Sequence, residues 1–192
     1  MSDKIFAFEK EFQKKDFTAK PLESGEYESC VFRNCDFSNS DFAGTVFIEC
    51  EFHSCNLSMV KIIGTAFRDV RFVDCKMLGM HFEYSNTFGL AMKFERCNLT
   101  HSSFHQLKLK STEFIEAMLD GVDFSDADLS NSSFRNSNLH GAIFQGSILE
   151  KVDFRGSQNF NIHPEANRIK GAKFSLQTLP GLLQAYNLEI ES

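Results

Sequence analysis

The chain has 192 residues, of which 42% are apolar, and a formal net charge of −6 at pH 7. This length predicts a single domain. No apolar run approaches the ~18 residues of a membrane-spanning segment, and the charged N-terminus lacks the apolar stretch of a signal peptide. The excess of acidic residues argues against direct DNA or RNA binding. We expect a soluble, cytoplasmic protein.

Phenylalanine recurs at a spacing of five residues, and 18 of the 22 phenylalanines lie on that spacing. The spacing shifts by two residues between Phe82 and Phe94, within the segment EYSNTFGLAMK. A period of five fits neither an amphipathic helix nor an alternating strand. A small residue stands two positions before each large apolar one, so both are expected to point inward. Each unit therefore predicts one side and one corner of a four-sided coil of 20 residues, and the shift predicts an outward loop.

Residues one coil apart, with two more positions counted across the shift, are expected to stack in columns along the core. All six cysteines occupy the small inward position, so we expect buried free thiols rather than disulfides or metal ligands. The predicted structural core includes one phenylalanine column and one cysteine column: Phe32, Phe52, Phe72, Phe94, Phe114, Phe134 and Phe154, with Cys35, Cys55, Cys75 and Cys97.

The units VDFSD ADLSN and SNLHG AIFQG match the consensus A(D/N)LXX, and the chain resembles the pentapeptide-repeat family over roughly residues 17–174. The resemblance implies an all-β fold, a right-handed quadrilateral β-helix. With about eight coils and ~4.8 Å between stacked strands, the rod would be about 38 Å long. We expect an N-terminal cap at 1–16, the β-helix at 17–174, and a C-terminal helix with an extended tail at 175–192.

The last segment, SLQTLPGLLQAYNLEIES, predicts a short helix with Ser175 as its N-cap. Its apolar residues are consistent with a simple end cap or with a two-fold interface between two chains. The second interpretation makes the protein a homodimer, with these interface residues: Leu179, Leu182, Leu183, Tyr186, Leu188 and Ile190.

The sequence contains none of the motifs of nucleotide-binding proteins, metalloproteases or serine hydrolases. His101 and His105 have the spacing of a metal site on a helix, but on a β-helix they lie around a corner from each other. A rod packed with Phe and Leu leaves no room for a catalytic pocket. We therefore expect no enzyme, no catalytic residues, no metal and no cofactor.

Charge is the remaining functional signal, because residues 111–155 hold eight acidic and three basic residues. Some charges should simply pair between coils, namely Glu51 with Arg71 and Lys93 with Glu113. The acidic excess indicates either a solubilising surface or an electrostatic docking face for a basic groove. The candidate partner-binding residues are Glu113, Glu116, Asp120, Asp123, Asp126, Asp128 and Asp153.

Within the family, the chain resembles the Qnr/MfpA/McbG type in its length, its NTFG loop and its NIHPEANRI segment. The resemblance implies a mimic of B-form DNA that binds DNA gyrase or topoisomerase IV, and some such proteins protect the enzyme from quinolones or peptide toxins. Quinolone-protecting members often project one or two long loops, whereas this chain is closer to the loop-free members.

Charge density gives a test of mimicry. B-DNA carries one charge per ≈ 1.7 Å, so about 38 Å would carry ~22 charges. Residues 21–192 hold 15 basic and 22 acidic residues, so a mimic must gather its acids on one face. The alternative function is a structural or adaptor rod with another protein partner. A continuous negative face favours mimicry, and alternating charges favour the adaptor.

Overall fold

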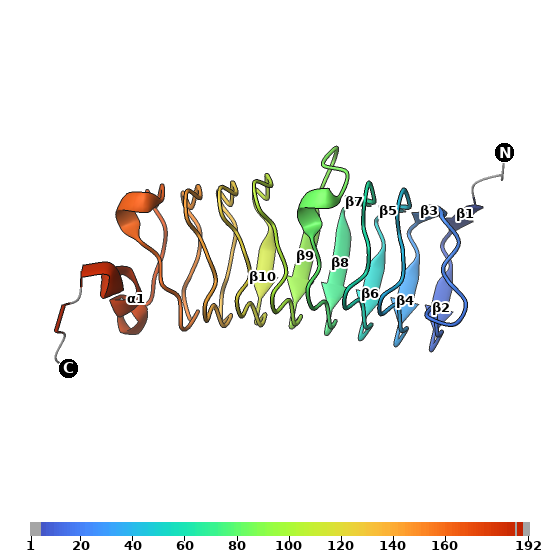
Figure 1. Cartoon of the computed structure of the whole chain (residues 1–192), viewed down its shortest axis with the longest axis horizontal. Coiled ribbons are helices and arrows are strands. Elements are labelled where there is room, and N and C mark those ends of the chain that lie inside the picture. The colour runs from blue at the N-terminus through green and yellow to red at the C-terminus, as the bar shows by residue number, and fades with distance from the viewer. Residues whose placement is uncertain (1–4, 187, 190–192) are drawn as a thin grey trace.

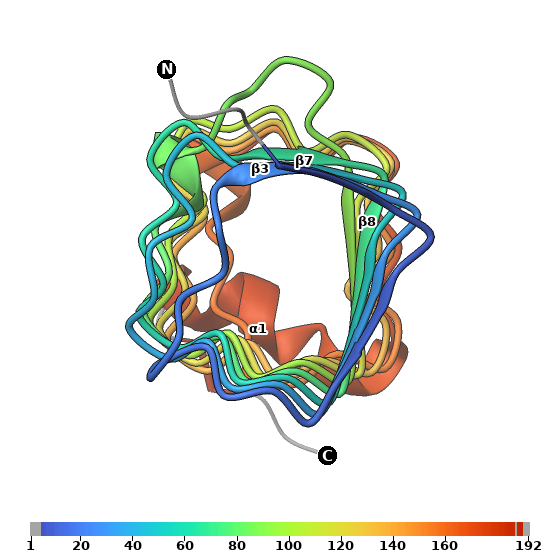
Figure 2. The same ribbon diagram turned by 90° about the vertical axis from the view of Figure 1, so that its right-hand side faces the viewer.

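The computed structural model describes residues 5–186 and 188–189 of the chain. The chain winds into a rod of stacked coils (Figure 1), and its end view has four sides (Figure 2). Its strands form two parallel sheets. The first contains β1 (Ile5–Phe8), β3 (Gly25–Glu28), β5 (Val46–Ile48) and β7 (Ala66–Arg68). The second contains β2 (Glu11–Gln13), β4 (Val31–Arg33), β6 (Glu51–His53), β8 (Val70–Val73), β9 (Met92–Glu95) and β10 (Glu113–Ile115).

The strand register follows the predicted repeat. Phe32 pairs with Phe52, which is the equivalent residue of the next coil. Phe72 pairs with Phe94 in the same way, although their interval is two residues longer because the loop lies between them. The predicted parallel β-solenoid is therefore confirmed, while its right-handedness and its eight coils stay predictions.

We number the four sides in chain order. Side 1 carries the sheet from β2 to β10, and side 4 carries the sheet from β1 to β7. On sides 2 and 3, neighbouring coils are joined by single-residue parallel bridges, such as Asp36 to Asn56 on side 2 and Asp41 to Lys61 on side 3. Similar bridges extend all four sides toward the C-terminus, as far as Asp153 to Lys173 on side 1.

The core is a set of stacked aromatic columns. The ring of Phe114 lies parallel to that of Phe134, with centroids 4.9 Å apart, and meets the ring of Phe104 edge-on at 5.5 Å. The seven phenylalanines and four cysteines expected in the core are all buried. Each coil therefore packs its large side chains on those of the next coil, so that stability arises mainly between neighbours.

The corners explain the D/N position of the repeat. The side chain before each central apolar residue often accepts the backbone N–H of the residue after it, as Asp123 Oδ1 does from Ser125 at 2.8 Å. The next residue takes a positive φ, for example 53° at Asn34 and 67° at Gly44. Asn and Gly tolerate this conformation better than other residues, which suits them to the turn.

The two ends differ. At the N-terminal end, β1 and β2 already pair with β3 and β4, so pairing between coils includes residues that the sequence prediction assigned to an N-terminal cap at 1–16. The C-terminal end contains the 3₁₀ turns η2 (Pro164–Ala166), η3 (Leu176–Thr178) and η4 (Gln184–Tyr186) and the helix α1 (Pro180–Leu183).

The helix α1 closes the C-terminal end of the core. A Cβ atom at Gly181 would lie 2.5 Å from the carbonyl oxygen of Phe160, so only glycine allows this approach. Ser175 makes no capping hydrogen bond, contrary to the prediction, because its Oγ accepts the N–H of Gly156 at 2.9 Å instead.

One loop interrupts the rod. It follows the 3₁₀ turn η1 (Phe82–Tyr84), spans residues 85–91 and projects outward from side 4 (Figure 1). Phe88 at its tip is 77% exposed, while Leu90 packs partly against the core. The two extra residues are thus absorbed outside the stack.

Candidate protein-interaction surfaces

The predicted docking carboxylates lie around the rod rather than along one face. Asp120 lies at the end of side 2 and Asp123 on side 3, whereas Asp126, with φ 56°, lies at the corner between sides 3 and 4. Glu116 lies at the corner between sides 1 and 2. The remaining three lie on side 1 (Glu113 and Asp153) and side 4 (Asp128). The structure therefore brings Asp120 and Asp123 together around one corner and places Asp126 at the far end of side 3.

Two of the three predicted carboxylates on sides 1 and 4, Asp128 and Asp153, already have partners. Asp128 lies 3.2 Å from the Nζ of Lys110, and Asp153 lies 2.7 Å from a guanidinium nitrogen of Arg155. The hydrogen bonds from Arg155 lower the pKa of Asp153, although partial burial opposes this. These two groups stabilise the rod locally and offer less free charge to a partner.

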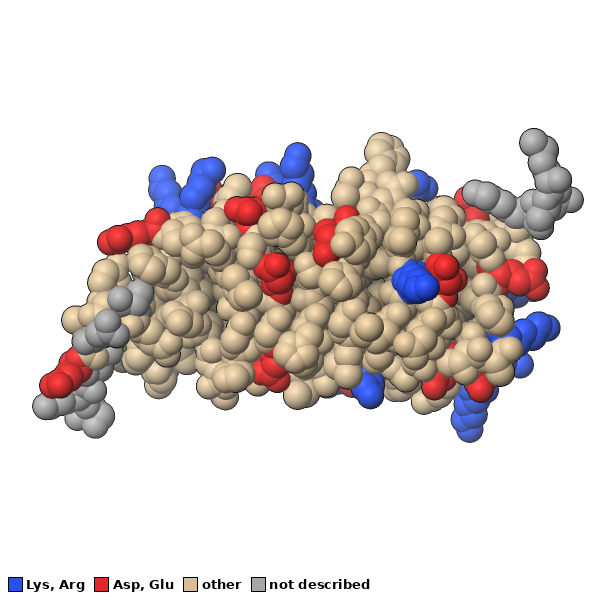
Figure 3. Space-filling view, in the orientation of Figure 1, with Lys and Arg blue, Asp and Glu red and all other residues tan. Residues whose placement is uncertain are grey.

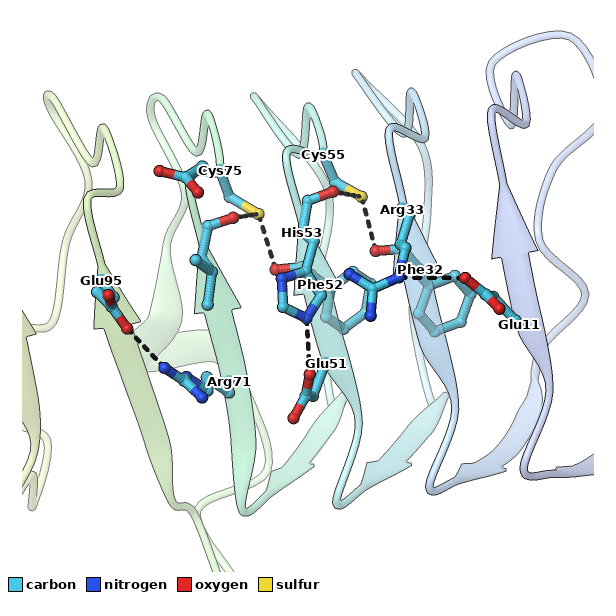
Figure 4. Close-up of polar contacts among 12 residues, drawn as sticks. Glu11, Phe32, Arg33, Glu51, Phe52, His53, Cys55, Arg71, Cys75 and Glu95 are labelled. Atoms are coloured by element: carbon cyan, nitrogen blue, oxygen red, sulfur yellow. Dashed lines mark hydrogen bonds and ion pairs between the residues drawn. The ribbon is translucent and has the colours of Figure 1, made fainter.

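Side 1 alternates in sign along the rod (Figure 4). Glu11 accepts a hydrogen bond from Arg33 at 3.1 Å, and Glu95 accepts one from Arg71 at 2.6 Å. These exposed pairs contribute little to stability, but they place positive and negative groups next to each other along side 1. Side 1 therefore offers no field of one sign.

The two predicted cross-coil pairs are register neighbours. Arg71 lies opposite Glu51 of the preceding coil, but its guanidinium forms an ion pair with Glu95 of the following coil. Lys93 lies opposite Glu113 in the register between β9 and β10. Sequence spacing thus predicts the neighbours correctly but not which neighbour forms the ion pair.

Sides 2 and 3 carry an excess of acid. On residues 35–45, 55–65, 75–85, 97–107 and 117–127, the only basic residues are Lys61 and Lys76. The carboxylates are spread along the rod, and few Lys or Arg side chains lie between them in the space-filling view (Figure 3). The carboxylates in these residue ranges are Asp36, Asp41, Glu83, Asp120, Asp123 and Asp126.

The expected dimer residues lie at the C-terminal end. Leu182 and Leu183 are half-buried, and Leu182 packs against the core. Leu179, Tyr186 and Leu188 are exposed, and the expected Ile190 lies outside the described residues. The same short segment thus covers the core with one set of side chains and presents another set to solvent.

The six cysteines are free and buried. Burial raises the pKa of the Cys50 thiol to about 12. Hydrogen bonds with Cys55 and Cys97, together with burial, raise the pKa of Cys75 as well. Such thiols are poor nucleophiles near neutral pH.

Across residues 5–186 and 188–189, no three His, Cys, Asp or Glu side chains gather in a metal-binding arrangement. His101 sits at a corner with φ 58°, around the turn from His105. Within the same ranges, no helix is long and apolar enough to cross a membrane.

The sequence interpretation missed the exposed aromatic residues in the loop and in the turn η1 before it. Phe88 is 77% exposed, Tyr84 is 59% exposed, and the guanidinium of Arg68 lies 5.7 Å from the Phe88 ring. A signal was present, because Phe88 is one of only four phenylalanines off the five-residue spacing. A phenylalanine outside the core pattern is a candidate for a contact surface.

A sealed aromatic core with chemically varied sides defines the chain as a β-solenoid. The family model of the pentapeptide repeat region matches residues 26–93 and 90–162. The chain belongs to the pentapeptide repeat family.

Solved structures share the fold. Two trypsin-treated variants of QnrB1, a plasmid-mediated fluoroquinolone resistance protein, are each 18% identical to the chain. The first match covers 96% of this chain and 99% of the other with a TM-score of 0.63. The second covers 97% and 100% with a TM-score of 0.61. HetL, a pentapeptide repeat protein involved in heterocyst differentiation regulation from the cyanobacterium Nostoc, is 13% identical over 87% of this chain and 86% of its own, with a TM-score of 0.41. No curated protein matches the chain.

Proposed function

We propose that this chain is a non-catalytic, cytoplasmic binding protein whose partner is a type II topoisomerase, DNA gyrase or topoisomerase IV. It would act as a DNA mimic by occupying the groove that receives duplex DNA, and so modulate the enzyme or protect it from quinolones or toxins. The observation that carries the proposal is the match to a fluoroquinolone resistance protein over nearly the full length of both chains.

Side 3 with its two corners is the surface that we assign to docking. Asp120, Asp123 and Asp126 lie along it, and few basic residues interrupt the acids of sides 2 and 3. A groove built for DNA is basic, so the negative potential would steer association and fix orientation. Sides 1 and 4 fit such a groove less well, because lysines and arginines are mixed into them.

The test is a gyrase supercoiling assay with purified protein, with and without a quinolone. One variant carries Asp120→Asn, Asp123→Asn and Asp126→Asn, since asparagine keeps the Oδ1 acceptor that holds the corner but removes the charge. We expect its inhibition to weaken about tenfold. The matched control removes three charges from sides 1 and 4, by Glu113→Gln, Asp128→Asn and Asp153→Asn, and should stay within about twofold of the native protein.

Each result has a defined meaning. Inhibition without drug rescue supports the competitor mechanism, and rescue supports protection. Equal effects of the two triple variants would overturn the assignment of side 3 and its corners as the docking surface. No effect of the folded protein at tens of micromolar would overturn the topoisomerase proposal. The alternative, a structural or adaptor rod, would then stand, and the alternating charges of side 1 favour it.

We also propose that the C-terminal segment pairs two chains. The exposed apolar residues Leu179, Tyr186 and Leu188 would form the interface, together with the half-buried Leu182 and Leu183, and Ile190 is retained from the sequence prediction. A Leu179→Glu variant should halve the mass measured by sedimentation if this interface forms, because it places a charge in an apolar contact. An unchanged mass would refute this interface.

A further inference from the structure

Side 4 has opposite charge in its two halves. Before the loop, residues 6–9, 26–29, 46–49 and 66–69 carry five carboxylates and one arginine. After the loop, residues 108–111, 128–131, 148–151 and 168–171 carry five basic residues and two carboxylates. Lysine and arginine side chains gather along the upper edge of the rod over its C-terminal half (Figure 3). The side is therefore strongly dipolar.

Most of these charges are free to meet a partner. Among the described residues, none of the five carboxylates of the acidic half lies within 4.0 Å of a basic group. Three lysines of the basic half likewise have no acidic group within 4.0 Å among the described residues. Arg168 and Lys110, in contrast, pair with Glu150 and Asp128. The unpaired groups are Glu9, Glu26, Glu28, Glu49 and Asp69 in the acidic half, and Lys108, Lys151 and Lys170 in the basic half.

The loop lies at the midpoint of this pattern. Ala66 bridges to Asn86 at the base of the loop, so four strand levels precede the loop on side 4 and four follow it. Phe88 projects from this midpoint and is 77% exposed. We call each four-residue segment of side 4 a level. If two copies face each other through side 4 and are related by a two-fold axis that passes between their loops, perpendicular to the rods, each level of the acidic half of one copy lies opposite a level of the basic half of the other.

A surface whose two halves have opposite sign is complementary to itself after such a rotation, as an isologous interface requires. A nucleic acid, with one sign throughout, would be repelled by the acidic half. We propose that two copies of this chain pair side by side and antiparallel through side 4, with the acidic half of each facing the basic half of the other and the two Phe88 rings near the two-fold axis.

The two halves match in net charge rather than residue by residue. The acidic half, with five carboxylates and one arginine, has a net charge of −4, and the basic half, with five basic residues and two carboxylates, has a net charge of +3. The level of Glu49 faces the level of Asp128, whose charge Lys110 already offsets at 3.2 Å. This interface uses neither the C-terminal helix nor sides 2 and 3, so it stands independently of the proposed function.

Sedimentation velocity over a range of protein concentrations, at low and at high salt, tests the pairing in chains that all carry Leu179→Glu, the otherwise native chain included, so that the C-terminal contact proposed above does not contribute to the mass. One variant carries Glu28→Lys and Asp69→Lys, and a second carries Lys108→Glu and Lys151→Glu. The first variant leaves the acidic half with three acidic and three basic residues, and the second leaves the basic half with three basic and four acidic residues. Neither variant retains two halves of opposite sign, so its dissociation constant should rise at least about tenfold. An equimolar mixture of the two should associate again, because a basic side then meets an acidic one. Misfolding would not give this rescue.

The control variant carries Lys61→Glu and Lys76→Glu, which change the net charge as the second variant does but lie on sides 2 and 3. Its association should match that of the native chain. Salt should weaken the native association, since the interface is charged. Phe88→Ala should weaken it without unfolding the rod. A monomeric native chain, a mass insensitive to both salt and charge reversal, or a mixture that fails to associate would each overturn the proposal.

Discussion

Replacing Phe114 by alanine should be among the most damaging single changes in the rod. The ring is fully buried and stacks between Phe94 at 5.1 Å and Phe134 at 4.9 Å, with Phe104 and Phe124 edge-on at 5.5 and 5.4 Å. A buried Phe→Ala change costs about 3–5 kcal/mol, and each aromatic pair contributes about 0.5–1.5 kcal/mol. Because the strand register holds the neighbouring rings apart, the cavity cannot collapse. We expect a loss of about 4–5 kcal/mol in the free energy of unfolding.

Urea denaturation followed by circular dichroism measures this loss. Phe88→Ala serves as the control, because its 77% exposed ring should change stability by no more than about 0.5 kcal/mol. Phe12→Ala should fall between the two, since Phe12 is only partly buried and belongs to the first coil. A loss below about 2 kcal/mol for Phe114→Ala, or equal losses at Phe114 and Phe88, would refute the stacked-core reasoning.

Three further outcomes are expected. Gly181→Ala should lower the free energy of unfolding by about 1–3 kcal/mol in urea, because its Cβ would lie 2.5 Å from the Phe160 carbonyl oxygen; an unchanged midpoint would contradict the close packing of α1. Burial raises the pKa of Cys50 to about 12, so a thiol reagent should label Cys50 only after denaturant is added; rapid native labelling there would contradict the sealed core. The pKa of Asp153 is lowered by Arg155, so its stabilising effect is complete at neutral pH and is lost as the pH falls below about 4. Asp153→Asn should therefore reduce the acid sensitivity of the melting temperature, and an identical pH profile would contradict this.

The core could be predicted from the sequence because every unit buries the same two positions. The spacing between Phe72 and Phe94 locates both the columns and the loop, and the structure has the same register. The first coil was missed, because Ala7 holds the core position where later coils have Tyr27 or Phe47. Its strands are identified only by their pairing with the next coil.

The charged surfaces could be predicted less well. Counting acids within residues 111–155 groups sequence neighbours, but a single coil turns through all four sides before it returns to the first. Asp123 and Asp128 belong to successive repeat units and therefore lie on different sides. Charges that share a side recur only once in each coil, so the dipolar pattern of side 4 emerges only when the sequence is read coil by coil.

The inserted loop shows how this architecture treats changes in length. The two extra residues leave the stack and bulge outward, whereas a deletion of one whole coil would remove a complete turn and bring equivalent positions into register. The length of the rod can therefore change only in steps of about 4.8 Å, the spacing of adjacent strands. Each step would also shift every surface group beyond it by the same distance, so evolution can alter the reach of this molecule without redesigning either end.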